Sequence, residues 1–166
     1  VGNVNVTTII ISINWQLYPS DVSAYPLHIS RTLHIAGECM DALCEVDGGQ
    51  QGPLFYILDG GALLLERLSL TNFYNTNGGV ITSLGTLVIN ACNMSRNHAS
   101  ERGGVLYATG GSLTMTNSNM THNTAMVVCP MPAILRIWPR IYDMLHGRSK
   151  RITEEISLAD RFLCAI

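Results

Sequence analysis

Short triplets of two apolar residues around one outward residue recur along this chain, separated by runs rich in glycine, asparagine, serine and threonine. Such a triplet is typical of a strand with one buried face. The clearest triplets run from Leu68 to Leu70, from Leu87 to Ile89 and from Leu113 to Met115. Each belongs to a segment that opens with Gly-Gly and an apolar residue, and these segments start at Gly60, Gly78 and Gly103. We therefore expect Leu68, Leu87 and Leu113 to lie one above another, each facing inward.

A large apolar residue and then an asparagine follow each triplet. The apolar residues are Phe73, Met94 and Met120, and the asparagines are Asn75, Asn97 and Asn123. Strands this short make poor hairpins, but they become stable when each coil stacks on the next and is hydrogen-bonded on both sides. We expect the asparagines to form a ladder of amide hydrogen bonds along the stack. We expect the glycine pairs to supply the positive φ that tight corners require.

Charge and composition favour strands over helices in this region. The charged residues between Gly60 and Ala125, all of which we expect at turns, are Glu66, Arg67, Arg96, Glu101 and Arg102. A helix would need apolar residues at three- and four-residue spacing and would tolerate so much glycine, asparagine and threonine poorly. The pattern predicts an all-β fold, namely a right-handed parallel β-helix of about four or five short coils.

Residues 1–125 resemble the parallel β-helix repeat proteins of the polymorphic outer-membrane-protein type and the large secreted β-helix proteins of algae and other protists. Those proteins carry Gly-Gly-Ala-Ile and Phe-x-x-Asn signatures. Here Gly-Gly-Ala occurs at Gly60, whereas the pairs at Gly78 and Gly103 precede valine. Met94 and Met120 stand where the signature has phenylalanine. The resemblance implies the fold far more strongly than it implies a function.

The tail, residues 126–166, drops this pattern and divides the chain into a repeat region (1–125) and an irregular region. Arg140–His146 and Thr153–Leu163 have helical patterns. Thr153 would cap the second helix, whose first turn carries Glu154 and Glu155. The tail is interpreted either as an amphipathic cap over the open end of the solenoid or as a segment that does not belong to the native fold.

Five cysteines allow a local bridge but suggest no zinc site, because no CxxC spacing occurs. Cys39 and Cys44 are close enough for a disulfide in an oxidising compartment; free buried thiols are the alternative. Four of the five histidines, His28, His34, His98 and His122, lack acidic or cysteine partners at ligand spacing. We expect no metal and no cofactor.

Parallel β-helices include pectin lyases and polygalacturonases, whose chemistry needs carboxylates converging from successive coils. Asp47 and Asp59 each precede a Gly-Gly, the ordinary place for an aspartate in a turn. Gly60–Ala125 contains no aspartate. We therefore expect no catalytic residues, and a fragment of a carbohydrate-active, pectin-lyase-like enzyme remains the alternative.

The net charge of −2 implies no strong attraction to nucleic acid or to an anionic membrane. The apolar run Thr7–Ile13 is too short to span a bilayer, and no export signal is visible. Three N-x-(Ser/Thr) sites, at Asn5, Asn93 and Asn119, are candidate glycosylation acceptors or chance matches.

The expected function is a structural or adhesive module of an extracellular or cell-surface protein, within a longer polypeptide. Serine, threonine and asparagine on the lateral face would make weak, multivalent contacts with glycans or surface proteins.

Overall fold

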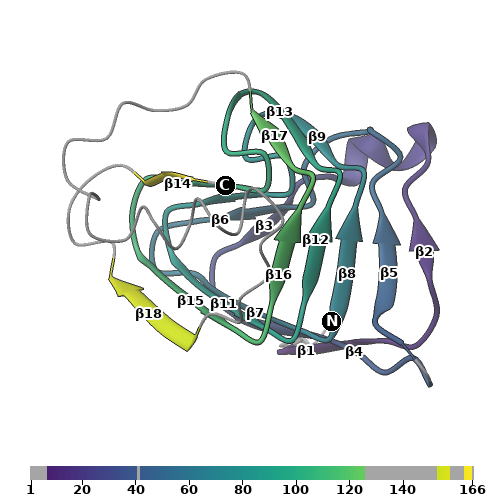
Figure 1. Ribbon diagram of the computed structural model, residues 1–166, viewed down its shortest axis with the longest axis horizontal. Coiled ribbons are helices and arrows are strands. Elements are labelled where there is room, and N and C mark those ends of the chain that lie inside the picture. Colours follow the sequence, from purple (N-terminus) through teal and green to yellow (C-terminus); the bar gives the residue numbers. More distant parts are fainter. Residues whose placement is uncertain (1–6, 41, 126–152, 158–162, 166) are drawn as a thin grey trace, which may run out of the picture.

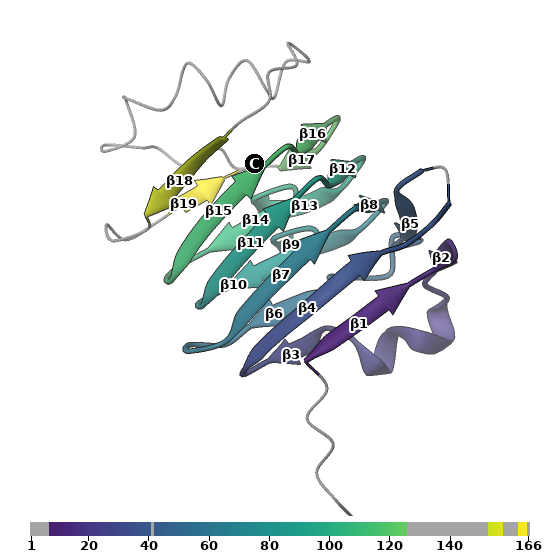
Figure 2. The ribbon, with the colours of Figure 1, turned by 90° about the horizontal axis from the view of Figure 1, so that it is seen from below.

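The computed structural model describes residues 7–40, 42–125, 153–157 and 163–165, which form a parallel β-solenoid of about four turns. The predicted fold class is confirmed. Figure 2 shows the longest sheet, sheet A, with the first coil at one end of the stack. In order, its strands are β1 (Thr8–Ile11), β4 (Thr32–Gly37), β7 (Ala62–Glu66), β11 (Thr86–Asn90), β15 (Ser112–Thr116) and β18 (Thr153–Ser157).

Three further sheets complete the coils. Sheet B, whose strands lie side by side in Figure 1, contains β2 (Trp15–Gln16), β5 (Cys44–Asp47), β8 (Leu68–Thr71), β12 (Asn93–Ser95) and β16 (Asn119–Thr121). Sheet C contains β3 (Leu27–Ile29), β6 (Phe55–Ile57), β10 (Ile81–Ser83), β14 (Leu106–Ala108) and β19 (Leu163–Ala165). Sheet D contains β9 (Tyr74–Asn77), β13 (His98–Arg102) and β17 (Thr124–Ala125). A 3-10 helix, η1 (Pro19–Ala24), joins β2 to β3.

In-register columns of apolar side chains form one continuous core, because alternate residues of every strand face the axis. One column of sheet A contains Leu33, Leu63, Leu87 and Leu113, and the next contains Ile35, Leu65, Ile89 and Met115. All of these side chains except the half-buried Leu33 are buried. The expected inward direction of the apolar positions is therefore confirmed. Right-handed winding, the rule for crossovers between parallel strands, stays a prediction.

The expected column of Leu68, Leu87 and Leu113 is wrong in its first member. Leu63 is the residue of that coil in register with Leu87. Leu68 lies one strand later, in sheet B, where it pairs with Cys44. The segment after Gly60 carries two apolar triplets in succession, one in β7 and one in β8.

The mistaken alignment arose because the three Gly-Gly pairs that open the aligned segments occupy two different corners. Gly61 lies against Gly85 just before sheet A, and a Cβ atom on Gly85 would collide with the carbonyl oxygen of Gly61. Gly79 instead stacks against Gly104, at the corner before sheet C. Aligning the segments on their glycines therefore displaced the first segment by one strand.

Residues other than glycine carry much of the corner geometry. The three expected glycines do have positive φ, with values of 75°, 66° and 62° at Gly60, Gly78 and Gly103. Two sets of residues with other side chains also adopt φ between 51° and 58°. They are Arg67, Ala91 and Asn117 after sheet A, and Asn72, Arg96 and His122 after sheet B. Each corner thus repeats its conformation while its side chain changes.

Two further expectations need correction. Not all charged residues lie at turns, because Glu66 ends β7 and both Glu101 and Arg102 belong to β13. Outward positions at strand ends remain solvated and accept charge. The asparagine ladder is confirmed for Asn97 and Asn123, but Asn75 is not part of it.

The described parts of the tail are strands. Thr153–Ser157 forms β18, which pairs antiparallel with β15, so the helix predicted over Thr153–Leu163 is wrong in its first turn. Leu163–Ala165 forms β19, antiparallel to β14. The free backbone groups of an edge strand favour such pairing over a local helix. The helix predicted over Arg140–His146 lies outside the described residues.

Candidate functional site

Aromatic and polar side chains line the outer faces of sheets C and D. On sheet C the in-register outward residues are His28, Tyr56, Thr82 and Tyr107. On sheet D they are Tyr74, His98 and Thr124. Their sequence neighbours are buried, such as Phe55 and Ile57 on sheet C and Asn97 and Ala99 on sheet D, so strand alternation sends these seven residues outward. We call these seven residues the aromatic stripe.

Stacking between coils orders four rings of the aromatic stripe. The rings of His28 and Tyr56 are stacked, with centroids 5.4 Å apart and planes 28° apart. Those of Tyr74 and His98 are stacked at 5.3 Å and 17°. In-register strands lie about 4.8 Å apart, so equivalent outward rings meet at the distance that suits aromatic pairs. The stripe is therefore a pre-ordered surface.

Hydrogen bonds connect the two halves of the stripe. Nη1 of Arg102, at the end of β13, donates to the hydroxyl oxygen of Tyr107 over 3.4 Å. Oγ1 of Thr82 donates to the carbonyl oxygen of Asn77 over 3.0 Å. Within sheet D, Nδ1 of His98 lies 2.7 Å from Oγ1 of Thr124. This surface thus combines ring faces, hydroxyl groups and a guanidinium, which together can contact the apolar faces and hydroxyl groups of a sugar or a peptide.

The polar side chains at the end of sheet A are hydrogen-bonded to one another across neighbouring strands. Nε2 of His34 lies 3.2 Å from Oε2 of Glu66. Nδ2 of Asn90 donates to Oε1 of Glu66 over 3.1 Å, and Oγ1 of Thr116 donates to Oδ1 of Asn90 over 2.9 Å. Because each group already bonds to the coil before or after it, this ladder holds the coils in register and is a weaker candidate for a ligand.

The carboxylates of sheet B also serve the backbone and neighbouring coils. Oδ1 of Asp47 accepts from the amide of Gly49 at 2.8 Å and from Nδ2 of Asn72 at 3.2 Å. Oε1 of Glu45 accepts from Oγ1 of Thr71 at 3.1 Å. Among the residues whose side chains the structure describes, no three histidine, cysteine, aspartate or glutamate side chains converge as a metal site would require.

Asn97 forms a buried link between coils. Its side chain is fully buried, and its Oδ1 accepts from the amide of Phe73 at 3.0 Å. Its Nδ2 donates to the carbonyl oxygen of Leu70 and to Oδ1 of Asn123, each over 3.1 Å. Phe73 occupies the equivalent corner of the preceding coil, so the repeat places an aromatic ring where the later coils have an amide.

The candidate glycosylation acceptors of sheet B stack on each other. Asn93 of β12 is in register with Asn119 of β16, while Met94 and Met120 face the core. Asn93 is half-buried and Asn119 is exposed, so both side chains face away from the core. Asn5 lies outside the described residues.

Within residues 7–125, the described cysteines are one bridged pair and one buried thiol. Cys39 and Cys44 form a disulfide, with Cα atoms 5.3 Å apart. Cys92 is free and buried, and burial raises the pKa of its thiol to about 11. A thiol that stays protonated at neutral pH is a poor nucleophile, so Cys92 belongs to the core. Cys129 lies outside the described residues.

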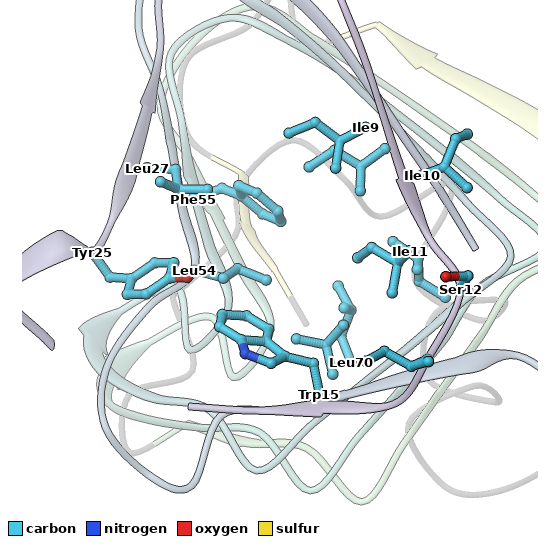
Figure 3. Close-up of a pocket in the computed structure, with 14 residues that line it drawn as sticks. Ile9, Ile10, Ile11, Ser12, Trp15, Tyr25, Leu27, Leu54, Phe55 and Leu70 are labelled. Carbon is cyan, nitrogen blue, oxygen red and sulfur yellow. The ribbon is translucent and has the colours of Figure 1, made fainter. Parts of the chain in front are cut away.

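An apolar cavity of about 360 Å³ opens at the first coil (Figure 3). Ile9, Ile11, Trp15, Tyr25 and Leu27 surround it, and buried residues of the later coils form its floor. The rings of Trp15 and Tyr25 lie 5.8 Å apart at its rim. The cavity is the interior of the solenoid at the end where the stack begins.

Comparisons with known proteins found no matching family model, no similar curated protein and no similar solved structure. No helix of the described chain combines the length and apolar character that crossing a membrane requires.

Sequence reasoning missed the tyrosines of the aromatic stripe and the position of Trp15 at the rim of the apolar cavity. Tyr56 and Tyr107 are two coils apart with Thr82 between them, so no short repeat connects them. Only the register of sheet C brings them together. The available signal was their shared position as the middle residue of an apolar triplet.

Proposed function

We propose that this chain is a non-catalytic structural or adhesive module of a secreted or cell-surface protein, and that the aromatic stripe is its contact surface. The observation that carries the proposal is the in-register stacking of His28 on Tyr56 and of Tyr74 on His98, connected at Arg102 and Tyr107. Rigid aromatic groups provide contact area at low cost in conformational entropy.

The occupant that suits this surface is a glycan or an extended segment of a surface protein. Each coil contributes few groups, so a single contact is weak. Because outward side chains lie in register on successive coils, an extended ligand can contact several coils at once. Such multivalent attachment raises the overall affinity. This favours a role within a longer surface protein of the polymorphic outer-membrane-protein type.

The disulfide between Cys39 and Cys44 supports placement outside the reducing cytosol. Structural disulfides persist mainly in secreted, periplasmic and surface proteins. The low content of charged residues, 13%, also suits a surface that contacts neutral glycans through hydroxyl and amide groups.

A binding assay with matched variants tests the proposal. The chain, displayed at high density on beads, is exposed to a panel of neutral and acidic polysaccharides and to cell surfaces. The double variant Tyr74→Ala/Tyr107→Ala should lose at least tenfold in retention, since two aromatic contacts of about 1 kcal/mol each are removed. The control Thr86→Ala/Ser112→Ala alters outward residues of sheet A and should retain binding.

Two results would overturn the proposal. Equal retention of both double variants would remove the aromatic stripe from the contact surface. Release of unsaturated or reducing ends from polygalacturonate or pectin by the purified chain would instead establish a carbohydrate-active enzyme.

A further inference from the structure

The two ends of the solenoid differ in their backbone pairing. At the far end β18 pairs with β15 and β19 pairs with β14, both antiparallel. At the near end β1, β2 and β3 are the terminal strands of sheets A, B and C, and among the described residues nothing pairs with their outer edges. One end of the stack therefore presents three adjacent strand edges around an apolar interior (Figure 2).

The large side chains of the β1–β2 segment at this end are apolar and accessible. Ile13 is 73% exposed, while Ile9 and Trp15, whose partners Ile35 and Val46 are buried, are 38% and 36% exposed. Inward positions of the later coils are buried by the coil on each side, whereas these are covered on one side only. Figure 3 shows Ile9, Ile11 and Trp15 around the cavity.

At the near end, β1 and β2 also lack the usual protection of a strand edge. Natural edge strands carry charges, prolines or bulges that prevent pairing with another chain. The segment from Thr7 to Tyr18 contains no charged residue and no proline, and β1 reads Thr-Ile-Ile-Ile. Such a strand is suited to pairing.

We propose that this end binds the same end of a second copy of the chain, with the two β1 edges antiparallel about a two-fold axis. A two-fold interface places each patch against its own equivalent in the other copy. A charged patch would therefore repel its equivalent, whereas the uncharged segment from Thr7 to Tyr18 produces no such repulsion. The far end shows that a coil edge of this solenoid accepts an antiparallel strand, since β15 accepts β18. In the dimer, Ile9, Ile13 and Trp15 of each copy cover the cavity of the other.

The test uses the full chain carrying Trp138→Phe, so that Trp15 is its one tryptophan. Sedimentation across a concentration series should show a species of twice 18.1 kDa, and the emission of Trp15 should shift to shorter wavelength as that species forms. Ile9→Lys and Ile13→Lys should each weaken association at least tenfold, because each places two like charges across the axis. Met40→Lys is the control, since Met40 is 97% exposed and does not line the cavity.

Several outcomes would overturn the proposal. One is a monomer at about 100 µM, a concentration at which even a weak dimer of micromolar affinity would form. Another is growth beyond the dimer, which indicates head-to-tail contact. A third is a monomer whose Trp15 emission is already shifted, which indicates that another part of the same chain covers the cavity. Equal association of Ile13→Lys and Met40→Lys, with unchanged far-ultraviolet circular dichroism, would exclude this surface.

Discussion

Leu87→Ala tests the packing of the solenoid most directly, because Leu87 is enclosed by a leucine on each side along the stack. Leu87 is 1% exposed and lies in register between Leu63 and Leu113, which are also buried. Backbone hydrogen bonds hold the three strands about 4.8 Å apart, so the neighbours cannot close the space that truncation leaves. Truncating a buried leucine costs about 2–5 kcal/mol, and a site that cannot collapse belongs in the upper half of that range.

Two variants provide the comparison. Thr114→Ala changes an outward residue of the adjacent strand and should alter the free energy of unfolding by less than about 0.5 kcal/mol. Leu33→Ala removes a half-buried side chain of the same column near the open end, and its loss should fall between those of Leu87→Ala and Thr114→Ala. Guanidinium titration followed by far-ultraviolet circular dichroism measures the free energy of unfolding of all three variants. The dependence of this free energy on denaturant concentration (the m-value) should be the same for each. Equal, small losses at Leu87 and Thr114 would refute the assignment of inward and outward faces.

Three further predictions concern a buried link between coils, a buried thiol and a disulfide. Asn97→Ala should cost about 1–3 kcal/mol for each buried backbone group that it leaves without a partner, and Asn123→Ala, at a half-buried corner, should cost less by the same titration. The pKa of Cys92 is raised from 9.0 to about 11, so the protonated thiol contributes fully to the free energy of unfolding below pH 9, and this contribution is lost as the pH rises towards 11. In urea titrations, Cys92→Ala should lack this part of the fall in stability at alkaline pH. Reducing the disulfide between Cys39 and Cys44 should lower stability by about 2 kcal/mol, and the double serine variant should show no response to reductant.

The local pattern of the chain was sufficient to predict strands and their buried faces. Leu87, Ile89, Leu113 and Met115 face inward because apolar residues two apart share one face of any strand. The register between coils needed more information. More than one corner of a coil can accept Gly-Gly, so the pair at Gly60 did not identify which corner it occupies, and Leu63 was overlooked in favour of a later residue.

The tail and the aromatic stripe depend on contacts that local patterns do not contain. Thr153 and the glutamates after it favour a helix in isolation, but the free edge of β15 supplies backbone partners, and a strand forms instead. Tyr56 and Tyr107 become neighbours of one surface only when the intervening coil is folded. Pairing between distant segments decided both outcomes.

The loop closed by Cys39 and Cys44 shows where this solenoid can gain sequence. The coil from His34 to Leu64 is longer than the coil from Leu64 to Val88, yet both keep the register of sheet A. Part of the extra length leaves the wall between β4 and β5, and Met40 there is almost wholly solvent-exposed. A foreign epitope grafted between the two cysteines would therefore project sideways from the solenoid at the coil that contains β4 and β5. The disulfide would hold its two ends together.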